Sequence, residues 1–372
     1  MAKTIIIAIL LIELVAPANS ASRSVRAAWV TAWNAGFLSE EQADATVDAA
    51  KQAGVKVLFV QVRKNADSYY ASLLEPAGNG YREGFDPLGY VVSAAHAKGI
   101  QVHAWVNVFR VWTGKDVATA SSEHIVRLHP EWINRDFWGS PRAAEGMFLD
   151  PGAPGVGEYI AEVAKDIACR YDIDGIHLDY IRYPGRDWGY SPPALASYCE
   201  TTGVRERPQP SDSRWSDWRR SQVTRTVRLV RGAVHSVKPR LPVSVAAICW
   251  GGYCDNPSKW ESYRNVFQDW AGWVTGGLVD VVVPMNYRSD ATTKGAQEFR
   301  KWAAGFRKWG GGKPIYVGID AENNTVASVK RQLEAAHKLG LDGVSLFPFN
   351  TGTKRNKLVT ALTVPDTRTS GG

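Results

Sequence analysis

The chain has 372 residues, of which 45% are hydrophobic and 22% are charged, the composition of a folded globular protein. This composition excludes disordered and fibrous chains. The formal net charge of +7 at pH 7 suits an anionic surface such as a cell envelope. No Lys/Arg-dense stripe or nucleic-acid motif accompanies the charge, so we expect no nucleic-acid partner.

The first twenty residues have the three regions of an export signal. Lys3 gives a positive start, residues 4–15 form an apolar stretch, and Ala18-Asn19-Ser20 is a small-residue cleavage site. The alternatives are a buried N-terminal helix and an uncleaved membrane anchor, but an anchor needs about 20 apolar residues, and this stretch is shorter and contains Glu13. We therefore expect residues 1–20 to be a signal peptide, the protein to be secreted or held at the cell envelope, and the mature chain to have no transmembrane span.

From residue 27 onward, short apolar runs alternate with amphipathic helical stretches, the pattern of a parallel sheet covered by helices. Helices are expected at Ser39 to Ala53, which opens with a capping box, and at Thr325 to Leu339. No Gly-rich phosphate fingerprint follows the first run, so the α/β class is expected as a closed (β/α)8 TIM barrel and not as an open doubly wound sheet. The eight expected strands are Ala27 to Trp33, Val55 to Val62, Ile100 to Val106, Gly175 to Asp179, Pro242 to Ile248, Val279 to Met285, Pro314 to Ile319 and Gly343 to Phe347.

One barrel domain over residues 21–364 accounts for this pattern, followed by a flexible tail at residues 365–372. We expect a monomer. The long connections follow strands, and barrel enzymes build their active sites from such loops. These loops are residues 63–85, 107–153, 180–212 and 249–257.

The cysteine count is even, with Cys169, Cys199, Cys249 and Cys254, and their spacings match no zinc motif. An oxidising compartment would allow pairing. Cys249 and Cys254 flank a Trp-Gly-Gly-Tyr turn and could close a small loop. Three connectivities are possible, and buried free thiols are the alternative.

Aromatic residues are numerous, with 15 Trp and 14 Tyr, and flat aromatic faces stack on sugar rings as well as filling cores. Trp250 is the first choice as a stacking platform because it follows an expected strand among small residues. The candidates in or near the loops are Trp33, Tyr69, Tyr70, Trp112, Trp188, Trp250 and Tyr253.

The most informative strand end is that of residues 175–179, where strand alternation puts His177 and Asp179 on one face with Asp179 at the tip. Catalytic side chains of barrel enzymes project from this end. A carboxylate there can protonate a glycosidic oxygen, activate water or attack the anomeric carbon. The alternative roles for Asp179 are an ion pair with Arg182 and a cap on the following loop.

Five segments of the sequence are informative when they are taken together: Arg26 to Val30, Gln61 to Ser72, His103 to Asn107, Leu149 to Gly152 and Asp174 to Pro184. Together and in this order they resemble the glycosyl hydrolase-like family 10 domain of bacteria, over most of residues 25–350. The resemblance implies a TIM barrel, an envelope or secreted location and glycosidase activity. Some relatives cleave peptidoglycan glycan strands that have been stripped of their peptides.

A more distant likeness is to the chitinase-like glycoside hydrolase family 18, whose fourth strand ends in D-G-x-D-x-D-x-E and whose sixth carries M-x-Y. Met285-Asn286-Tyr287 fits the second motif, and Asp179 falls at the last Asp of the first. Ile181 stands where that family has its acid Glu, and His177 replaces the preceding Asp. The substrate-assisted mechanism of that family is therefore not supported, and a partner for Asp179 must come from another strand.

A glycoside hydrolase of the usual type needs a second carboxylate, about 5 to 5.5 Å from the first for retention or about 6.5 to 9.5 Å for inversion. Asp67 is the preferred partner because it lies in a family-like segment and in a loop that can face the cleft. Asp320 and Glu322 are alternatives by topology. Asp150 precedes a helix start and is expected to be structural, and Asp290 is a weaker candidate.

Further polar and aromatic residues at strand ends are expected to bind sugar hydroxyls, stack on a ring or tune a carboxylate. His103 fits a substrate ligand and a core histidine equally well. The expected substrate-binding residues are Arg63, Trp105, Asn107, Tyr180, Arg182, Trp250, Asn286, Tyr287 and Asp320.

The sequence therefore predicts a secreted glycoside hydrolase that acts on a bacterial envelope polysaccharide or oligosaccharide through Asp179 and Asp67. Denuded peptidoglycan glycan strands are a candidate substrate. No G-x-S-x-G elbow or H-E-x-x-H motif occurs, so neither a serine hydrolase, a metal site nor a cofactor is expected. The alternatives are a non-catalytic carbohydrate-binding barrel, which Ile181 keeps open, and a transglycosylase, which differs only in its acceptor.

Overall fold

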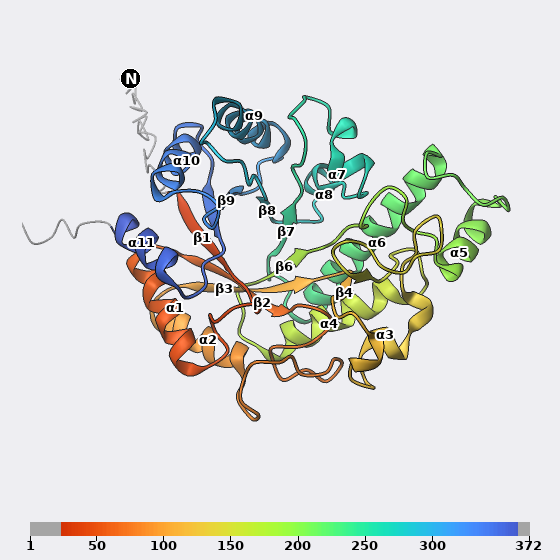
Figure 1. Ribbon diagram of the computed structural model, residues 1–372, viewed down its shortest axis with the longest axis horizontal. Coiled ribbons are helices and arrows are strands. Elements are labelled where there is room, and N and C mark those ends of the chain that lie inside the picture. The colour runs from red at the N-terminus through yellow and green to blue at the C-terminus, as the bar shows by residue number, and fades with distance from the viewer. Residues whose placement is uncertain (1–23, 364–372) are drawn as a thin grey trace, which may run out of the picture.

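The computed structural model describes residues 24–363. The expected signal peptide, residues 1–20, and the expected tail, residues 365–372, lie outside the described residues. Eight parallel strands form one sheet in the order β8-β7-β6-β3-β2-β1-β10-β9, with helices arranged around it (Figure 1). These strands are β1 (Val25–Val30), β2 (Val57–Arg63), β3 (Gln101–Asn107), β6 (Gly175–Asp179), β7 (Val243–Ala247), β8 (Val281–Pro284), β9 (Tyr316–Asp320) and β10 (Gly343–Phe347).

The first and last strands of this order, β8 and β9, also meet. The Val282 N–H donates to the Pro314 carbonyl at 3.0 Å, and Val282 forms a parallel bridge with Ile315. The sheet therefore closes on itself as a barrel. The predicted (β/α)8 fold is confirmed, and each of the eight predicted strands has a counterpart.

Alternate side chains on each strand face the barrel interior or the helices, as the period of a strand requires. Trp29, Phe59 and Trp105 fill the interior. His177 joins them there, since it accepts from the Trp29 indole at 2.9 Å and lies 2.9 Å from the Ser244 hydroxyl. His103 is also buried in the interior, and burial lowers its pKa to about 4, so it is a neutral core histidine.

The helices begin where the sequence places caps. The Ser39 hydroxyl accepts from the Gln42 N–H at 3.3 Å and opens α1, but the Gln42 side chain accepts from Gly36 and Leu38 instead of closing the capping box on Ser39. The Thr325 hydroxyl accepts from the Ser328 N–H and opens α10. The α-helices are α1 (Glu40–Gln52), α2 (Pro87–Ala97), α3 (Ile125–Leu128), α4 (Val156–Arg170), α5 (Pro192–Thr202), α6 (Ser213–Val237), α7 (Glu261–Arg264), α8 (Trp270–Thr275), α9 (Thr293–Trp309), α10 (Val326–Lys338) and α11 (Thr353–Leu362). No helix among residues 24–363 is long and apolar enough to cross a membrane.

The long loops contain ordered elements that the sequence pattern did not predict. Residues 107–153 include an antiparallel pair, β4 (Arg110–Trp112) and β5 (Met147–Phe148), in which Arg110 pairs with Phe148. Residues 180–212 include α5, at the far right of Figure 1 beyond α6. Strands of two or three residues are too short for alternation to be visible in a sequence. Three short 3₁₀ helices complete the loops, at Val117–Thr119, Pro130–Trp132 and Pro257–Lys259.

The four cysteines are free thiols, so the small loop closed by Cys249 and Cys254 does not form. The two side chains have different surroundings. Cys249 is buried in the core, where burial raises its pKa to about 12, whereas the Cys254 thiol lies 3.6 Å from the Asn256 carbonyl in a half-exposed turn.

Candidate active site

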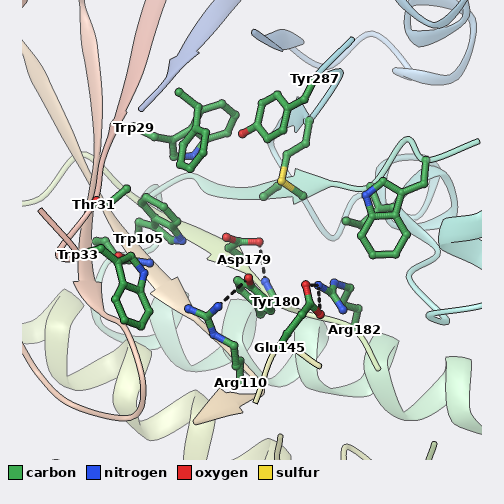
Figure 2. A pocket seen from close by; sticks show the side chains of 16 residues that line it. Trp29, Thr31, Trp33, Trp105, Arg110, Glu145, Asp179, Tyr180, Arg182 and Tyr287 are labelled. Atoms are coloured by element: carbon green, nitrogen blue, oxygen red, sulfur yellow. Dashed lines mark hydrogen bonds and ion pairs between the residues drawn. The ribbon is translucent and has the colours of Figure 1, made fainter. Parts of the chain in front are cut away.

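A cleft of about 250 Å³ opens at the C-terminal ends of the barrel strands. Its floor comes from side chains of the barrel interior, and its walls come from the residues that follow the strands and from the β4–β5 pair (Figure 2). This is the face where barrel enzymes place their active sites. The lining residues are Trp29, Thr31, Trp33, Gln61, Trp105, Arg110, Glu145, Asp179, Tyr180, Arg182, Ala246, Ile248, Trp250, Met285, Tyr287 and Phe347.

Asp179 is the last residue of β6, and its carboxyl group faces this cleft (Figure 2). The side chain is only 8% exposed, and one oxygen accepts from the Tyr180 N–H at 2.7 Å. Burial raises the pKa of Asp179, because it disfavours the charged form. That hydrogen bond and the guanidinium groups of Arg182 and Arg110 act in the opposite direction and are outweighed. A carboxyl of this kind is suited to hold a proton and deliver it.

Tyr180 turns the chain sharply as it leaves β6. Its φ of +50° lies in the left-handed region, which costs a bulky residue about 1 to 3 kcal/mol. Two backbone bonds hold this turn, from the Val108 N–H to the Asp179 carbonyl at 2.7 Å and from the Phe109 N–H to the Tyr180 carbonyl at 3.3 Å. The loop after β3 therefore fixes the direction of the β6 tip, and the Tyr180 hydroxyl receives a bond from Arg110 at 2.8 Å.

The second carboxylate in the cleft is Glu145, which the sequence did not single out. Both its oxygens accept from one nitrogen of Arg182, at 2.8 and 2.9 Å, and its side chain is 40% exposed (Figure 2). Gly146 follows it with a φ of +117°, and a Cβ there would lie 2.3 Å from the Trp112 carbonyl oxygen. The tight turn of residues 143–146, which precedes β5 and is closed by backbone bonds between Ala143 and Gly146, thus presents Glu145 to the cleft. A Glu-Gly step in a long loop after a strand was the available signal.

Five of the expected substrate-binding residues line the cleft: Trp105, Tyr180, Arg182, Trp250 and Tyr287. Trp250 is 39% exposed, and the Arg182 guanidinium lies 5.1 Å from the centre of its ring. Tyr287 stacks on Phe347, with ring centres 5.4 Å apart. Trp33 and Trp250 are both more than one third exposed and provide flat faces at the cleft.

Asp67 is not among the residues that line the cleft. Its carboxylate accepts from the Asn65 N–H at 2.6 Å and lies 3.4 Å from the Tyr69 hydroxyl. These contacts are those of a turn-forming aspartate in the loop after β2. The expectation that Asp67 partners Asp179 therefore has no geometric support, whereas Glu145 stands in the same cleft as Asp179.

Arg63 also lies outside the cleft, in a closed network at the end of β2. It is fully buried and forms an ion pair with Glu75 at 2.7 Å, and it donates to the carbonyls of Asn107 and Val108. The Tyr159 hydroxyl of α4 donates to Glu75. Burial is the largest single effect and lowers the pKa of Arg63, but the Glu75 carboxylate and the Tyr159 side chain together outweigh burial and raise it. Arg63 therefore fixes the loops after β2 and β3 to α4.

Three other expected binding residues have internal partners. The Asn107 amide donates to the Lys64 carbonyl at 2.8 Å, and the Asn286 amide donates to the Phe299 carbonyl at 3.1 Å. The Asp320 carboxylate accepts from two backbone N–H groups in the turn after β9. None of the three lines the cleft.

The alternative carboxylates lie elsewhere too. Asp150 is buried and accepts from the Gly152 and Ser191 N–H groups, in agreement with its expected structural role before α4. Asp290 forms an ion pair with Arg331. Glu322 lines a separate pocket between the loops after β1, β9 and β10. Of the expected stacking platforms, Tyr69, Tyr70, Trp112, Trp188 and Tyr253 do not line the cleft.

Comparisons with known proteins identify the family and the fold of the chain. The family model of glycosyl hydrolase-like 10 matches residues 24–333. The chain is 26% identical to glycosyl hydrolase YngK of Bacillus subtilis strain 168 over 299 residues, which is 73% of this chain and 56% of that protein. It is 24% identical to glycosyl hydrolase DigH of Escherichia coli K12 over 262 residues, which is 65% of this chain and 56% of DigH. The chain thus spans little more than half the length of these relatives.

Solved structures share the fold. The glycoside hydrolase domain of PgaB (BpsB) from Bordetella bronchiseptica has a TM-score of 0.70 at 15% identity, covering 92% of this chain and 99% of that domain. Alpha-L-fucosidase isoenzyme 2 of Paenibacillus thiaminolyticus has a TM-score of 0.63 at 14% identity, covering 91% of this chain and 49% of the fucosidase. At these identities the likeness concerns the barrel alone. With the family model matched over most of its length, the chain belongs to the glycosyl hydrolase-like 10 family.

Proposed function

We propose that the protein is a glycoside hydrolase that cleaves a polysaccharide of the bacterial envelope, with Asp179 and Glu145 as its two acting carboxyl groups. The observation that carries the proposal is the buried Asp179 carboxyl with its raised pKa in an aromatic cleft that also contains Glu145. Family membership and the named relatives support the reaction class.

The two groups differ in a way that suggests their roles. Asp179 is buried and its raised pKa favours the protonated form, which suits the general acid that protonates the leaving oxygen. Glu145 is more exposed and is ion-paired with Arg182, which suits a carboxylate that activates water or attacks the anomeric carbon. Sugar rings would stack on Trp33 and Trp250 at the two sides of the cleft.

We further propose that the protein acts outside the cytoplasm as a monomer, on denuded peptidoglycan strands as the first substrate to examine. The export signal expected at residues 1–20 and the net charge of +7 support this location. Fractionation of cells that produce the full chain would test the location, and light scattering would test the monomer. A full-length chain found only in the cytoplasm would contradict the proposed location.

The reaction is tested by incubating the purified protein with denuded peptidoglycan, chitin oligomers and other envelope glycans, and by counting new reducing ends. We expect the wild type to release products, and Asp179→Asn and Glu145→Gln to release far less. Asp67→Asn is the matched control, because it removes a carboxylate outside the cleft and should retain activity.

Each outcome of this experiment has a distinct meaning. Loss of activity in Asp67→Asn with retention in Glu145→Gln would restore Asp67 as the partner and overturn Glu145. Glycan binding without cleavage by any form would support a carbohydrate-binding barrel. Products longer than the substrate at high sugar concentration would identify a transglycosylase.

A further inference from the structure

Arg110 is a buried cation of the cleft that has no contacting counter-ion within the described part of the chain. It begins β4, is 8% exposed and lines the cleft between Trp33 and Tyr180 (Figure 2). Its guanidinium carbon lies 4.1 Å from the centre of the Tyr180 ring and 5.3 Å from that of Trp33. Among residues 24–363, its one side-chain hydrogen bond goes to the Tyr180 hydroxyl at 2.8 Å, and its Nε has no partner.

Two arginines that also face or flank the strand ends, Arg63 and Arg182, differ from Arg110. Arg63 is neutralised by Glu75, and Arg182 is neutralised by Glu145. For Arg110, no carboxylate of the described chain lies within ion-pairing distance. Burial of a charge is costly unless the charge is paired. The aromatic faces of Trp33 and Tyr180 offset part of this cost through cation–π contacts, but they supply no acceptor for the free donors.

Asp179 does not serve as the missing counter-ion. Although the guanidinium of Arg110 acts on it electrostatically, burial has the larger effect and raises the pKa of Asp179, which favours the protonated carboxyl relative to an exposed aspartate. A protonated Asp179, the form needed for acid catalysis, leaves the positive charge of Arg110 unbalanced. Lys64 does not line the cleft but lies on the same side, with its ammonium 4.6 Å from the centre of the Trp33 ring, and the nearby Asp67 carboxylate offsets part of its charge.

The two sides of the cleft therefore differ in charge. On one side Arg182 and Glu145 cancel, next to Trp250. On the other, Arg110 and Lys64 flank Trp33. We infer that Arg110 is a specificity determinant that binds a carboxylate on a sugar ring stacked at Trp33, so that the substrate is an acidic glycan. A planar guanidinium with free donors matches a carboxylate better than it matches a sugar hydroxyl.

This inference rests on the proposed hydrolase function but can be tested separately. The probe is a matched pair of substrates: denuded peptidoglycan strands with their lactyl carboxylates intact, and the same strands with these carboxylates reduced to alcohols. Oligouronates form a third arm, because a ring carboxylate is the other source of the same chemistry. The measured quantities are kcat/KM for the wild type and Kd for the inactive Asp179→Asn variant.

We expect the wild type to prefer the carboxylated strands by about 10- to 100-fold, the range of a charge-assisted hydrogen bond. Arg110→Gln should remove this preference, and Arg110→Lys should restore part of it. Arg225→Gln is the control for net charge, because Arg225 is an exposed residue of α6 that pairs with Glu158 away from the cleft. Any effect of Arg110 on the protonation of Asp179 is the same for both kinds of strand. The ratio of their kcat/KM values is therefore free of that effect.

Equal kcat/KM of the wild type on both strands, with no cleavage or binding preference for oligouronates, would overturn the inference and leave the hydrolase proposal intact. A preference for oligouronates alone would assign the site to a ring carboxylate. An equal fall in kcat/KM on the carboxylated and the reduced strands in Arg110→Gln would also overturn the inference. If no glycan is cleaved, the proposed hydrolysis fails, and the Kd values for the two strands still decide the inference. Should Arg110→Gln fail to fold, the wild-type comparison and Arg110→Lys remain decisive.

Discussion

The ends of β2 and β6 carry the same kinds of residue but differ in how those residues are neutralised. At β2, the side chains of Arg63 and Glu75 are at most 1% exposed. They pair with each other, with the Asn107 and Val108 carbonyls and with the Tyr159 hydroxyl. At β6, Asp179 is buried without a contacting cation among the described residues, and Arg182 reaches a half-exposed Glu145. Buried charges that are fully paired within the protein stabilise the fold. Charged groups that are incompletely paired at a cleft can still bind a ligand.

This comparison predicts opposite consequences for substitutions at the two strand ends. Changes at the β6 tip should lower activity with little loss of stability, and changes at the β2 tip should lower stability with little direct effect on chemistry.

Asp179→Asn should lower kcat/KM by about 10²- to 10⁴-fold, the usual contribution of a general acid or base. Its free energy of unfolding at neutral pH should be equal to that of the wild type or higher, because burial of the charged carboxylate is costly in the native state. Urea unfolding and initial rates on the same preparations test both parts. Asp290→Asn, which removes a carboxylate paired with Arg331 away from the cleft, is the control and should keep its activity.

Glu75→Gln should lower the free energy of unfolding by about 3 to 5 kcal/mol, because it leaves the Arg63 guanidinium buried and unpaired. The midpoint of equilibrium unfolding in urea, or the folding and unfolding rates as a function of urea concentration, measures this loss. The fraction that remains folded should have a kcat close to that of the wild type. A large fall in kcat with an unchanged midpoint would mean that the β2 tip takes part in the chemistry.

The pH dependence of activity and of stability tests the raised pKa of Asp179 at the end of β6. Because the folded-state pKa of Asp179 lies above its ordinary value of 3.8, activity that needs its proton should fall as pH rises through the raised pKa. The same shift lowers stability as pH rises: Asp179 costs nothing below its unfolded pKa and its full penalty above its folded pKa. Asp179→Asn should therefore match the wild type in stability at low pH and exceed it increasingly above. A difference in the free energy of unfolding between Asp179→Asn and the wild type that does not change with pH would contradict the raised pKa of Asp179.

Trp250→Ala should raise KM by about 2- to 10-fold, because a stacking contact contributes about 0.5 to 1.5 kcal/mol. Trp250 is 39% exposed at the cleft, so little core packing is lost. Trp138, which is 76% exposed and does not line the cleft, is the matched control. Equal KM values for Trp250→Ala and Trp138→Ala would remove Trp250 from the binding surface.

The sequence predicted the barrel because the alternation of apolar runs with amphipathic stretches is a local signal, and β6 and β10 agree with their predicted bounds residue by residue. It also predicted that Asp179 lies at the tip of a strand, where the structure places it, since a strand tip can be identified from alternation alone. Glu145 could not be found in the same way. Its position depends on the pairing of β4 with β5 and on the turn at Gly146, within a loop where the residues carry no period.

Arg63, Asn107 and Asp67 were expected at the site, but the structure places them outside the residues that line the cleft. They lie at or just after strand ends, as catalytic residues do, but their partners, such as Glu75 and the Lys64 carbonyl, are set by tertiary contacts. A strand end identifies which residues are near the rim of the barrel. Whether a side chain faces the cleft or bonds to a neighbouring loop depends on contacts that sequence spacing does not encode.

The most direct test of the account is cleavage of a susceptible glycan in H₂¹⁸O, followed by mass spectrometry of the products. We expect one ¹⁸O atom at the new reducing end for each bond cleaved by the wild type, and almost no labelled product from Asp179→Asn or Glu145→Gln. Labelled product from Asp179→Asn at the wild-type rate, or cleavage by the wild type without label, would contradict hydrolysis at this cleft.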